Sequence, residues 1–393
     1  MRQTRTIVLG GAGIAGLTAS LALARAGFYT IVLERSETLS EAGAGIQLSP
    51  NAGNALAALG LEAALAPISV EPSALEIRSG RSGAILALAP LGVEIAELYG
   101  APYRVVHRAD LQRILVHAAR DAGVDIRLAT EITGFEVGAE SVKIRAAASS
   151  GDEEFLASAL IGADGIHSTV RRLLPGAARP EHSGRLAWRA VLPRAAVPNG
   201  LSSDHIGLWL GERAHIVHYP LRGGKEVNLV AIVEDSSAGK GWSEPGDADW
   251  LAERFRDWAP LPRTLIAAVP QWLKWPLLTV PPSGSWASGA VALIGDAAHA
   301  MLPFLAQGGA MAIEDGGVLA KALAARPDDA PVALAAFAQE RIARVSGVWR
   351  NASRNGRIYH LSPPASLLRD LGMGLLGGPK LLSNYDWIYR WQA

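Results

Sequence analysis

Two groups of residues in this sequence have spacings that could support chemistry. The first is the run GAGIAG, with Gly11, Gly13, Ala15 and Gly16. Its glycines allow a tight turn and let backbone N–H groups approach the pyrophosphate of a dinucleotide at a helix N-terminus. Glu34 follows about twenty residues later, where a carboxylate can bind a ribose hydroxyl. These residues predict a site for a cofactor with an ADP half, either NAD or FAD.

The second group is the pair His215 and Tyr219 in the segment HIVHYP. In a strand both side chains stand on one face, while His218 points to the other. Histidine can accept a proton near neutral pH, so the pair could form a catalytic site. The alternative interpretation is that both are ordinary polar residues on a sheet face.

The elements that must position these residues can be read from hydrophobic periodicity. Residues 6–9 and 29–33 predict strands, and 17–26 between them predicts a helix that ends at Gly27. This complete β-α-β unit strengthens the glycine motif. Further strands are predicted at 159–162 and 290–294, and the small residues of 309–325 predict a closely packed helix.

Composition excludes several classes of function. Lys plus Arg total 37 and Asp plus Glu total 37, so no basic field attracts nucleic acid. The sequence has no cysteine, which removes thiolate catalysis and Cys-based metal sites, and no HExxH run is present. We therefore expect no metal site, no nucleic-acid partner and no membrane span, and we expect any redox chemistry to come from a bound cofactor.

The predicted fold class is α/β, with a Rossmann-like FAD- or NAD-binding domain interleaved with an α+β substrate domain. The cofactor domain is predicted at 1–72, 100–180 and 285–340, and the substrate domain, built on a mostly antiparallel sheet, at 73–99 and 181–284. Residues 341–393 are predicted to form a C-terminal helical segment.

Three further segments extend the glycine motif. They are LIGADGIHS at 160–168, LIGDAAH at 293–299 and AQGG at 306–309. In this order and spacing the sequence resembles the class A FAD-dependent aromatic hydroxylases, which have the p-hydroxybenzoate hydroxylase fold and a GR2-type FAD domain. The resemblance is greatest to salicylate hydroxylase, 3-hydroxybenzoate 6-hydroxylase and 6-hydroxynicotinate 3-monooxygenase, and it covers nearly the whole chain.

The resemblance implies a set of FAD-binding residues. Asp296 would contact the ribityl chain, Asp164 would organise the pyrophosphate region, and Arg108 would face the phosphates or the ribityl chain. A helix that begins near Gly308 would also direct its positive end at the flavin ring, which becomes an anion on reduction. The complete predicted set is Gly11, Gly13, Ala15, Gly16, Glu34, Arg35, Gln47, Arg108, Asp164, Asp296, Gly308 and Gly309.

The resemblance also implies the reaction, which is hydroxylation of a small phenolic or hydroxy-heteroaromatic acid by NAD(P)H and O2 through a C4a-hydroperoxyflavin. His215 would deprotonate the phenol, Tyr219 would orient the substrate, and Gln307 is a second polar candidate beside the flavin. NADH and NADPH both remain open as the co-substrate.

Three alternatives remain at this point. They are an epoxidase or reductase of the same fold that acts on a larger apolar substrate, a non-catalytic FAD-binding interaction protein, and a plain NAD-dependent dehydrogenase. We expect a cytoplasmic location, because residues 1–11 lead directly into a strand without a signal-peptide pattern, and a monomer or homodimer.

Overall fold

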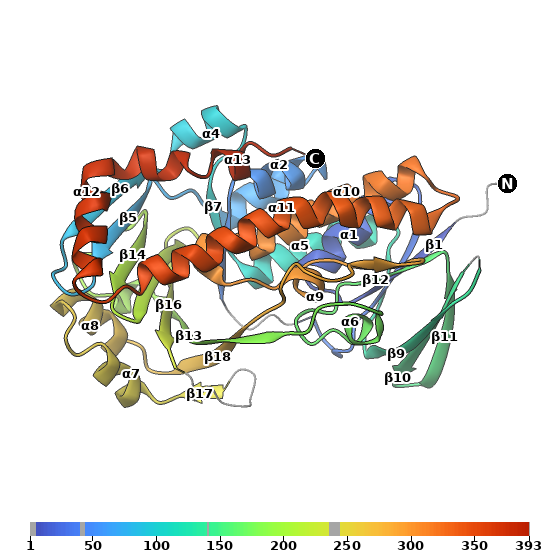
Figure 1. Cartoon of the computed structure of the whole chain (residues 1–393), viewed down its shortest axis with the longest axis horizontal. Helices are drawn as coiled ribbons and strands as arrows, with labels where there is room; N and C mark the ends of the chain where they lie inside the picture. Colours follow the sequence, from blue (N-terminus) through green and yellow to red (C-terminus); the bar gives the residue numbers. More distant parts are fainter. Residues whose placement is uncertain (1–4, 40–43, 140, 236–243, 393) are drawn as a thin grey trace.

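Two large β-sheets organise the chain, with helices packed around them (Figure 1). The structure is a computed structural model and describes residues 5–39, 44–139, 141–235 and 244–392. Among these residues no helix is long and apolar enough to cross a membrane.

The first large sheet is mostly parallel and fully buried at its centre. Its central strands pair in parallel, and only the edge strand β19 runs antiparallel to its neighbour. Such strands read as continuous apolar runs because helices cover both faces of a parallel sheet. In spatial order the strands are β19 (Ala287–Ser288), β20 (Val291–Leu293), β12 (Ala159–Gly162), β1 (Thr6–Gly10), β2 (Tyr29–Leu33) and β8 (Asp125–Arg127).

Helix α1 (Ile14–Arg25) follows β1 and is buried from Ile14 to Leu23. It packs between α5 (Arg108–Asp121) and α10 (Gly308–Ala325). The approach to α10 depends on Gly316, because a Cβ there would lie 2.9 Å from the backbone nitrogen of Ala19. The small residues of α10 therefore allow the close packing that the sequence predicted.

The second large sheet is mostly antiparallel, and β14 and β5 form its parallel pair. Trp188, Trp209 and Trp272 are buried in a core beneath two helices, α7 (Ala248–Arg254) and α8 (Pro260–Ala267). The strands in spatial order are β17 (Glu244–Gly246), β18 (Trp272–Thr279), β13 (Glu181–Pro193), β16 (Glu226–Glu234), β15 (Ala214–Leu221), β14 (His205–Gly211), β5 (Ala74–Ser79) and β6 (Ile85–Pro90).

Two smaller sheets and a set of helices complete the fold. One sheet has β11 (Gly151–Ala157), β10 (Val142–Ala148) and β9 (Thr130–Val137), and the other has β3 (Gly45–Leu48), β7 (Arg104–His107) and β4 (Ser69–Val70). The remaining helices are α2 (Pro50–Ala58), α3 (Glu62–Leu65), α4 (Val93–Tyr99), α6 (Thr169–Leu173), α9 (Asp296–His299), α11 (Ala330–Tyr359), α12 (Ala365–Ser383) and α13 (Asp386–Tyr389), with short 3-10 turns at Ala66–Ile68, Arg194–Ala196 and Pro303–Leu305.

The α/β fold class is confirmed, and two details differ from the sequence prediction. Helix α11 runs unbroken through position 341, where we placed the start of the C-terminal segment, and Figure 1 shows it extending along both sheets. Pro331 lies in the first turn of α11, where proline is tolerated, and the next proline is Pro363, beyond the end of the helix. The sequence also has a helical pattern over residues 105–123. Helix α5 nevertheless begins only at Arg108, because the β-branched Val105 and Val106 pair with β3 and β4.

Candidate active site

The glycine motif forms the turn between β1 and α1. Gly11 has φ +99°, and a Cβ there would lie 2.6 Å from the carbonyl oxygen of Ala163. A Cβ on Gly16 would clash with the carbonyl oxygen of Gly11, so both glycines are needed by the turn itself. A Cβ on Gly13 would meet no atom of the described residues within 4 Å. Gly13 therefore opens onto free space at the N-terminus of α1, where a phosphate can approach the backbone.

That space continues into a groove beside the second strand, lined by Glu34, Arg35 and Asp164 together with Gly11 and Gly13. Glu34 accepts hydrogen bonds from the backbone N–H groups of Ala12 (2.8 Å) and Ser36 (2.9 Å). These contacts fix the carboxylate at the end of β2.

Asp164 has a structural role in this groove. Its carboxylate accepts hydrogen bonds from the Ser168 hydroxyl and from the backbone N–H groups of Thr169 (2.7 Å) and Val170 (3.1 Å). Burial raises the pKa of Asp164, and these hydrogen bonds oppose that rise. Asp164 thus holds the start of α6, while its neighbours Ala163 and Gly165 line the cavity.

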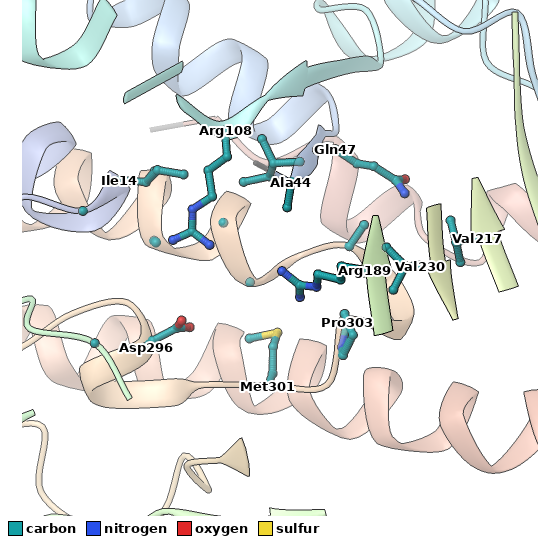
Figure 2. A pocket seen from close by; sticks show the side chains of 18 of the residues that line it. Ile14, Ala44, Gln47, Arg108, Arg189, Val217, Val230, Asp296, Met301 and Pro303 are labelled. Carbon is teal, nitrogen blue, oxygen red and sulfur yellow. The ribbon is translucent and has the colours of Figure 1, made fainter. Parts of the chain in front are cut away.

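A larger cavity lies between the two sheets, and we call it the central cavity. Figure 2 shows Arg108 entering it from one side and Asp296 lying on the other, with the guanidinium of Arg189 directed into the space between them. Its lining includes most of the predicted cofactor residues, namely Gly13, Ala15, Gln47, Arg108, Asp296, Gly308 and Gly309.

The N-terminus of α10 borders the central cavity through two glycines. A Cβ on Gly309 would lie 2.5 Å from Cδ1 of Ile46, so a side chain there would push the Ile46 side chain aside. A Cβ on Gly308 would meet, among the residues that the structure describes, only the Met301 side chain, at 3.9 Å. Backbone amides at Gly308 are therefore open to a ligand, and the 18-residue helix directs its positive end toward that position.

His215 and Tyr219 line the central cavity from β15, and both are buried. They share one face of the strand as predicted, whereas His218 packs against Gly207 and Trp209. Burial raises the pKa of Tyr219, so its phenol stays protonated at neutral pH. His215 also lines a second cavity, the inner cavity, with Tyr103, Phe304, Tyr359 and others. The histidine thus stands where the two cavities meet.

The His215 ring also contacts a second histidine, His360, through one of its ring nitrogens. Nδ1 of His215 lies 2.8 Å from Nε2 of His360, the residue that follows α11. Nδ1 of His360 lies 3.1 Å from a carboxylate oxygen of Glu234. Burial lowers the pKa of His215 well below its ordinary value and lowers the pKa of His360 to about 4. Both imidazoles are therefore neutral at neutral pH.

Gln307 has a different environment from the one we predicted. Its side chain is buried, donates to the Ser49 hydroxyl (2.8 Å) and accepts from the Asn51 amide (3.1 Å). Asn51 in turn donates to Glu314 (2.7 Å). Gln307 is not among the residues that line the central or the inner cavity, because its amide is directed into this network. The structure therefore gives no support for contact with a substrate.

Another buried histidine, His299, supports the loop that carries Asp296. Nε2 of His299 lies 2.7 Å from Asp315, which also accepts from the backbone N–H of Gly295 (2.9 Å). Arg341 donates to Asp315 and to Glu314, both at 2.7 Å. This network fixes the GDAAH loop against α10 and α11.

Two residues of the site were missed by the prediction of site residues. His360 lies 145 positions from His215, and nothing local in the sequence links them. Arg189 is adjacent to the buried Trp188, and its guanidinium lies over the Trp275 ring at 5.4 Å. Neighbouring residues of a strand point to opposite faces, so Arg189 lies on the face of β13 opposite to the buried Trp188. That alternation is the only signal in the sequence for its position at the cavity, and it is weak.

Comparison with known proteins identifies the fold and the family of relatives. Residues 3–352 match a family model described as FAD binding domain. The chain is 37% identical over 387 residues to 3-hydroxybenzoate 6-hydroxylase 1 of Aquipseudomonas alcaligenes, covering 98% of this chain and 97% of that protein. It is 36% identical over 393 residues to 3-amino-4-hydroxybenzoate 2-monooxygenase PtnB3 of Streptomyces platensis, covering 100% and 97%. A solved salicylate hydroxylase substrate complex superimposes with a TM-score of 0.84 at 24% identity, covering 100% of this chain and 97% of that one.

Proposed function

This chain belongs to the FAD-binding family of aromatic-ring monooxygenases, and from that premise we propose that its substrate is a benzoate carrying a phenolic hydroxyl group. Both named relatives act on such acids. The observation that supports the proposal is that His215 and Tyr219 line the same cavity as Asp296 and Gly308. A proton acceptor and a cofactor cradle thus face one space.

The chain's own residues fit FAD. The open space at Gly13 would hold the pyrophosphate at the N-terminus of α1, and the groove beside Glu34 and Arg35 would hold the adenosine. Arg108 and Asp296 then lie along the central cavity toward the open backbone at Gly308. Bound FAD supplies hydride acceptance and activation of O2.

Each side chain around the substrate has a separate task. A phenol is most reactive toward an electrophilic oxygen after it loses its proton, and neutral His215 can accept that proton. Tyr219 stays protonated and can donate a hydrogen bond to a substrate oxygen. Arg189, directed into the central cavity, supplies a positive charge for the carboxylate of the acid.

Exclusion of water is the remaining requirement, because the oxidising species otherwise decays to hydrogen peroxide. Apolar side chains that line the central cavity, including Val217, Val230, Ile232, Met301 and Pro303, provide this barrier. We further propose that NADH or NADPH is the reductant. Because the reaction would consume the NADH or NADPH of the cytoplasm, we also propose a cytoplasmic location.

The test is to purify the protein with FAD bound and to measure NADH and NADPH oxidation against a panel of hydroxylated benzoates and hydroxynicotinates. We expect oxidation that a phenolic acid accelerates, little hydrogen peroxide, and a product heavier by one oxygen atom. A benzoate without a hydroxyl group is the matched control and should give no product. If no phenolic acid accelerates NAD(P)H oxidation, the proposed substrate class is wrong.

A further inference from the structure

Three titratable side chains lie in a line from the central cavity to the protein surface. His215 is 1% exposed, His360 is 5% exposed, and the side chain of Glu234 is 28% exposed. The distances between their facing atoms are 2.8 Å from His215 to His360 and 3.1 Å from His360 to Glu234. The line begins at a residue that touches the cavity and ends at one that touches water.

Packing holds the two rings in this arrangement. The ring centroid of His215 lies 5.0 Å from that of Phe304 and 5.6 Å from that of Tyr359, both in edge-to-face geometry. The ring centroid of Phe304 also lies 5.9 Å from that of His360. A side chain fixed on both edges keeps one rotamer, so the hydrogen-bonded line is built into the core and does not depend on a mobile surface contact.

The carboxylate at the outer end determines which ring nitrogens carry protons. Ionised Glu234 can only accept, so Nδ1 of His360 must donate to it. Neutral His360 then has an unprotonated Nε2, which can only accept from Nδ1 of His215. Neutral His215 is left with an unprotonated Nε2, and this is the nitrogen available to a ligand in the cavity. The line thus sets His215 as a base toward the substrate.

We propose that His360 and Glu234 form a proton relay that carries the phenol proton from His215 to solvent, an inference that rests on the proposed function. Nε2 of His215 takes the proton from the substrate hydroxyl as Nδ1 releases its own to Nε2 of His360. His360 releases the proton on its Nδ1 to a Glu234 oxygen, and Glu234 releases it to water. One proton enters and one leaves, so the substrate remains as the phenolate and both imidazoles stay neutral, with their protons moved to the opposite ring nitrogens. Return of a proton from water through Glu234, His360 and His215 to the product oxygen restores the starting protonation.

The charged groups around the relay are consistent with this direction. Arg185 from β13 and Arg213 from the turn between β14 and β15 both contact Glu234, at 3.3 Å. His360 and these cations lower the pKa of Glu234 against the opposing effect of burial, which keeps the outer carboxylate ionised. Burial lowers the pKa of His360, Glu234 acts to raise it, and Arg185 and Arg369 from α12 add to the lowering. Tyr359 is held protonated by burial and does not compete as a base.

His360 and Glu234 are positioning residues, since neither touches the substrate, and the decisive variant is Glu234→Gln. Glutamine keeps the shape but can donate as well as accept, so it no longer fixes His215 as a base. We expect kcat to fall about tenfold at neutral pH with little change in KM, and the rising limb of the kcat profile to move to higher pH. The absorbance of the phenolate bound to oxidised enzyme should appear at correspondingly higher pH.

The matched control is Glu226→Gln. Glu226 lies at the other end of β16, its side chain is also 28% exposed, and it pairs with Arg222. This variant should keep the wild-type pH profile of kcat. A second variant, His360→Ala, breaks the line and should regain turnover when imidazole is added, as a purely structural loss would not.

The outcomes separate the two proposals. If wild-type enzyme hydroxylates no phenolic acid, the proposed function fails. If wild-type enzyme is active and Glu234→Gln has the same pH profile and the same phenolate titration as Glu226→Gln, the relay is wrong while the function stands. Loss of activity in His360→Ala without rescue by imidazole would also count against the relay.

Discussion

The molecule contains two buried histidine networks with opposite connections to their surroundings. In the cofactor region, His299 contacts Asp315, and Arg341 joins Asp315 to Glu314, with the side chains of all four at most 1% exposed. In the substrate region, His215 contacts a cavity at one end and leads through His360 to the half-buried Glu234 at the other. The first network is closed and charged, whereas the second is open at both ends and its imidazoles are neutral.

The difference shows what a buried histidine does when its partners differ. Burial acts to raise the pKa of Asp315, but His299 and Arg341 outweigh it and lower that pKa to about 2. Fixed charges of this kind hold a loop in place. Within the described part of the chain no carboxylate contacts the ring of His215, so burial keeps it neutral and able to accept a proton.

The largest expected effect comes from opening the closed network with Arg341→Met. This change leaves the buried Asp315 without its arginine and leaves Glu314, among the described residues, paired with Arg344 alone, which costs about 3–5 kcal/mol of the free energy of unfolding. Chemical denaturation of purified protein measures the loss. Arg256→Met is the control, because Arg256 pairs on the exposed surface, and it should leave the unfolding transition in place. Equal transitions for the two variants would contradict a supporting role for the closed network.

Removal of the base from the open network should affect turnover more than stability. In His215→Asn we expect kcat for hydroxylation to fall about 100-fold or more, since general base catalysis contributes roughly 10²–10⁴-fold. FAD binding, followed by the flavin absorbance, should persist. Product formation and NAD(P)H oxidation together measure the effect. Unchanged kcat would show that the phenol loses its proton elsewhere.

The reciprocal substitution in the closed network is His299→Asn. It removes a hydrogen bond to a buried carboxylate, so we expect a loss of about 1.5–3 kcal/mol in the free energy of unfolding. Folded enzyme should keep the wild-type pH profile of kcat, because His299 does not line the central or the inner cavity. A shifted pH profile would mean that the two networks are coupled.

The smallest effect concerns the pH dependence of stability. Because the pKa of His360 falls from its ordinary value of 6.5 to about 4 on folding, the unfolded chain binds a proton more readily between those values. The contribution of His360 to the free energy of unfolding is therefore fully present above about pH 6.5 and is lost progressively down to about pH 4. Replacement of His360 by Gln should make this decline shallower in urea titrations at several pH values, and an equally steep decline would contradict the assignment.

The sequence anticipated the two regions unequally. The cofactor cradle follows from local constraints, because Gly11, Gly13 and Gly16 lie in one turn and Glu34 ends the next strand. The pair His215 and Tyr219 follows from the two-residue period of a strand. Gln307 could not be oriented in this way, because its direction depends on the position of Ser49 and Asn51, which come from another element.

The sequence alone determined the α/β fold class, the glycine turn with its FAD-binding family, and the face of β15 that bears the histidine, because each depends on residues within one or two adjacent elements. Only the tertiary structure brought His360, at the end of α11, between His215 of β15 and Glu234 of β16. It also enclosed Arg341 between two carboxylates of α10. Such contacts depend on how long helices cross a sheet, and periodicity within a segment carries no information about which distant residue will arrive beside it.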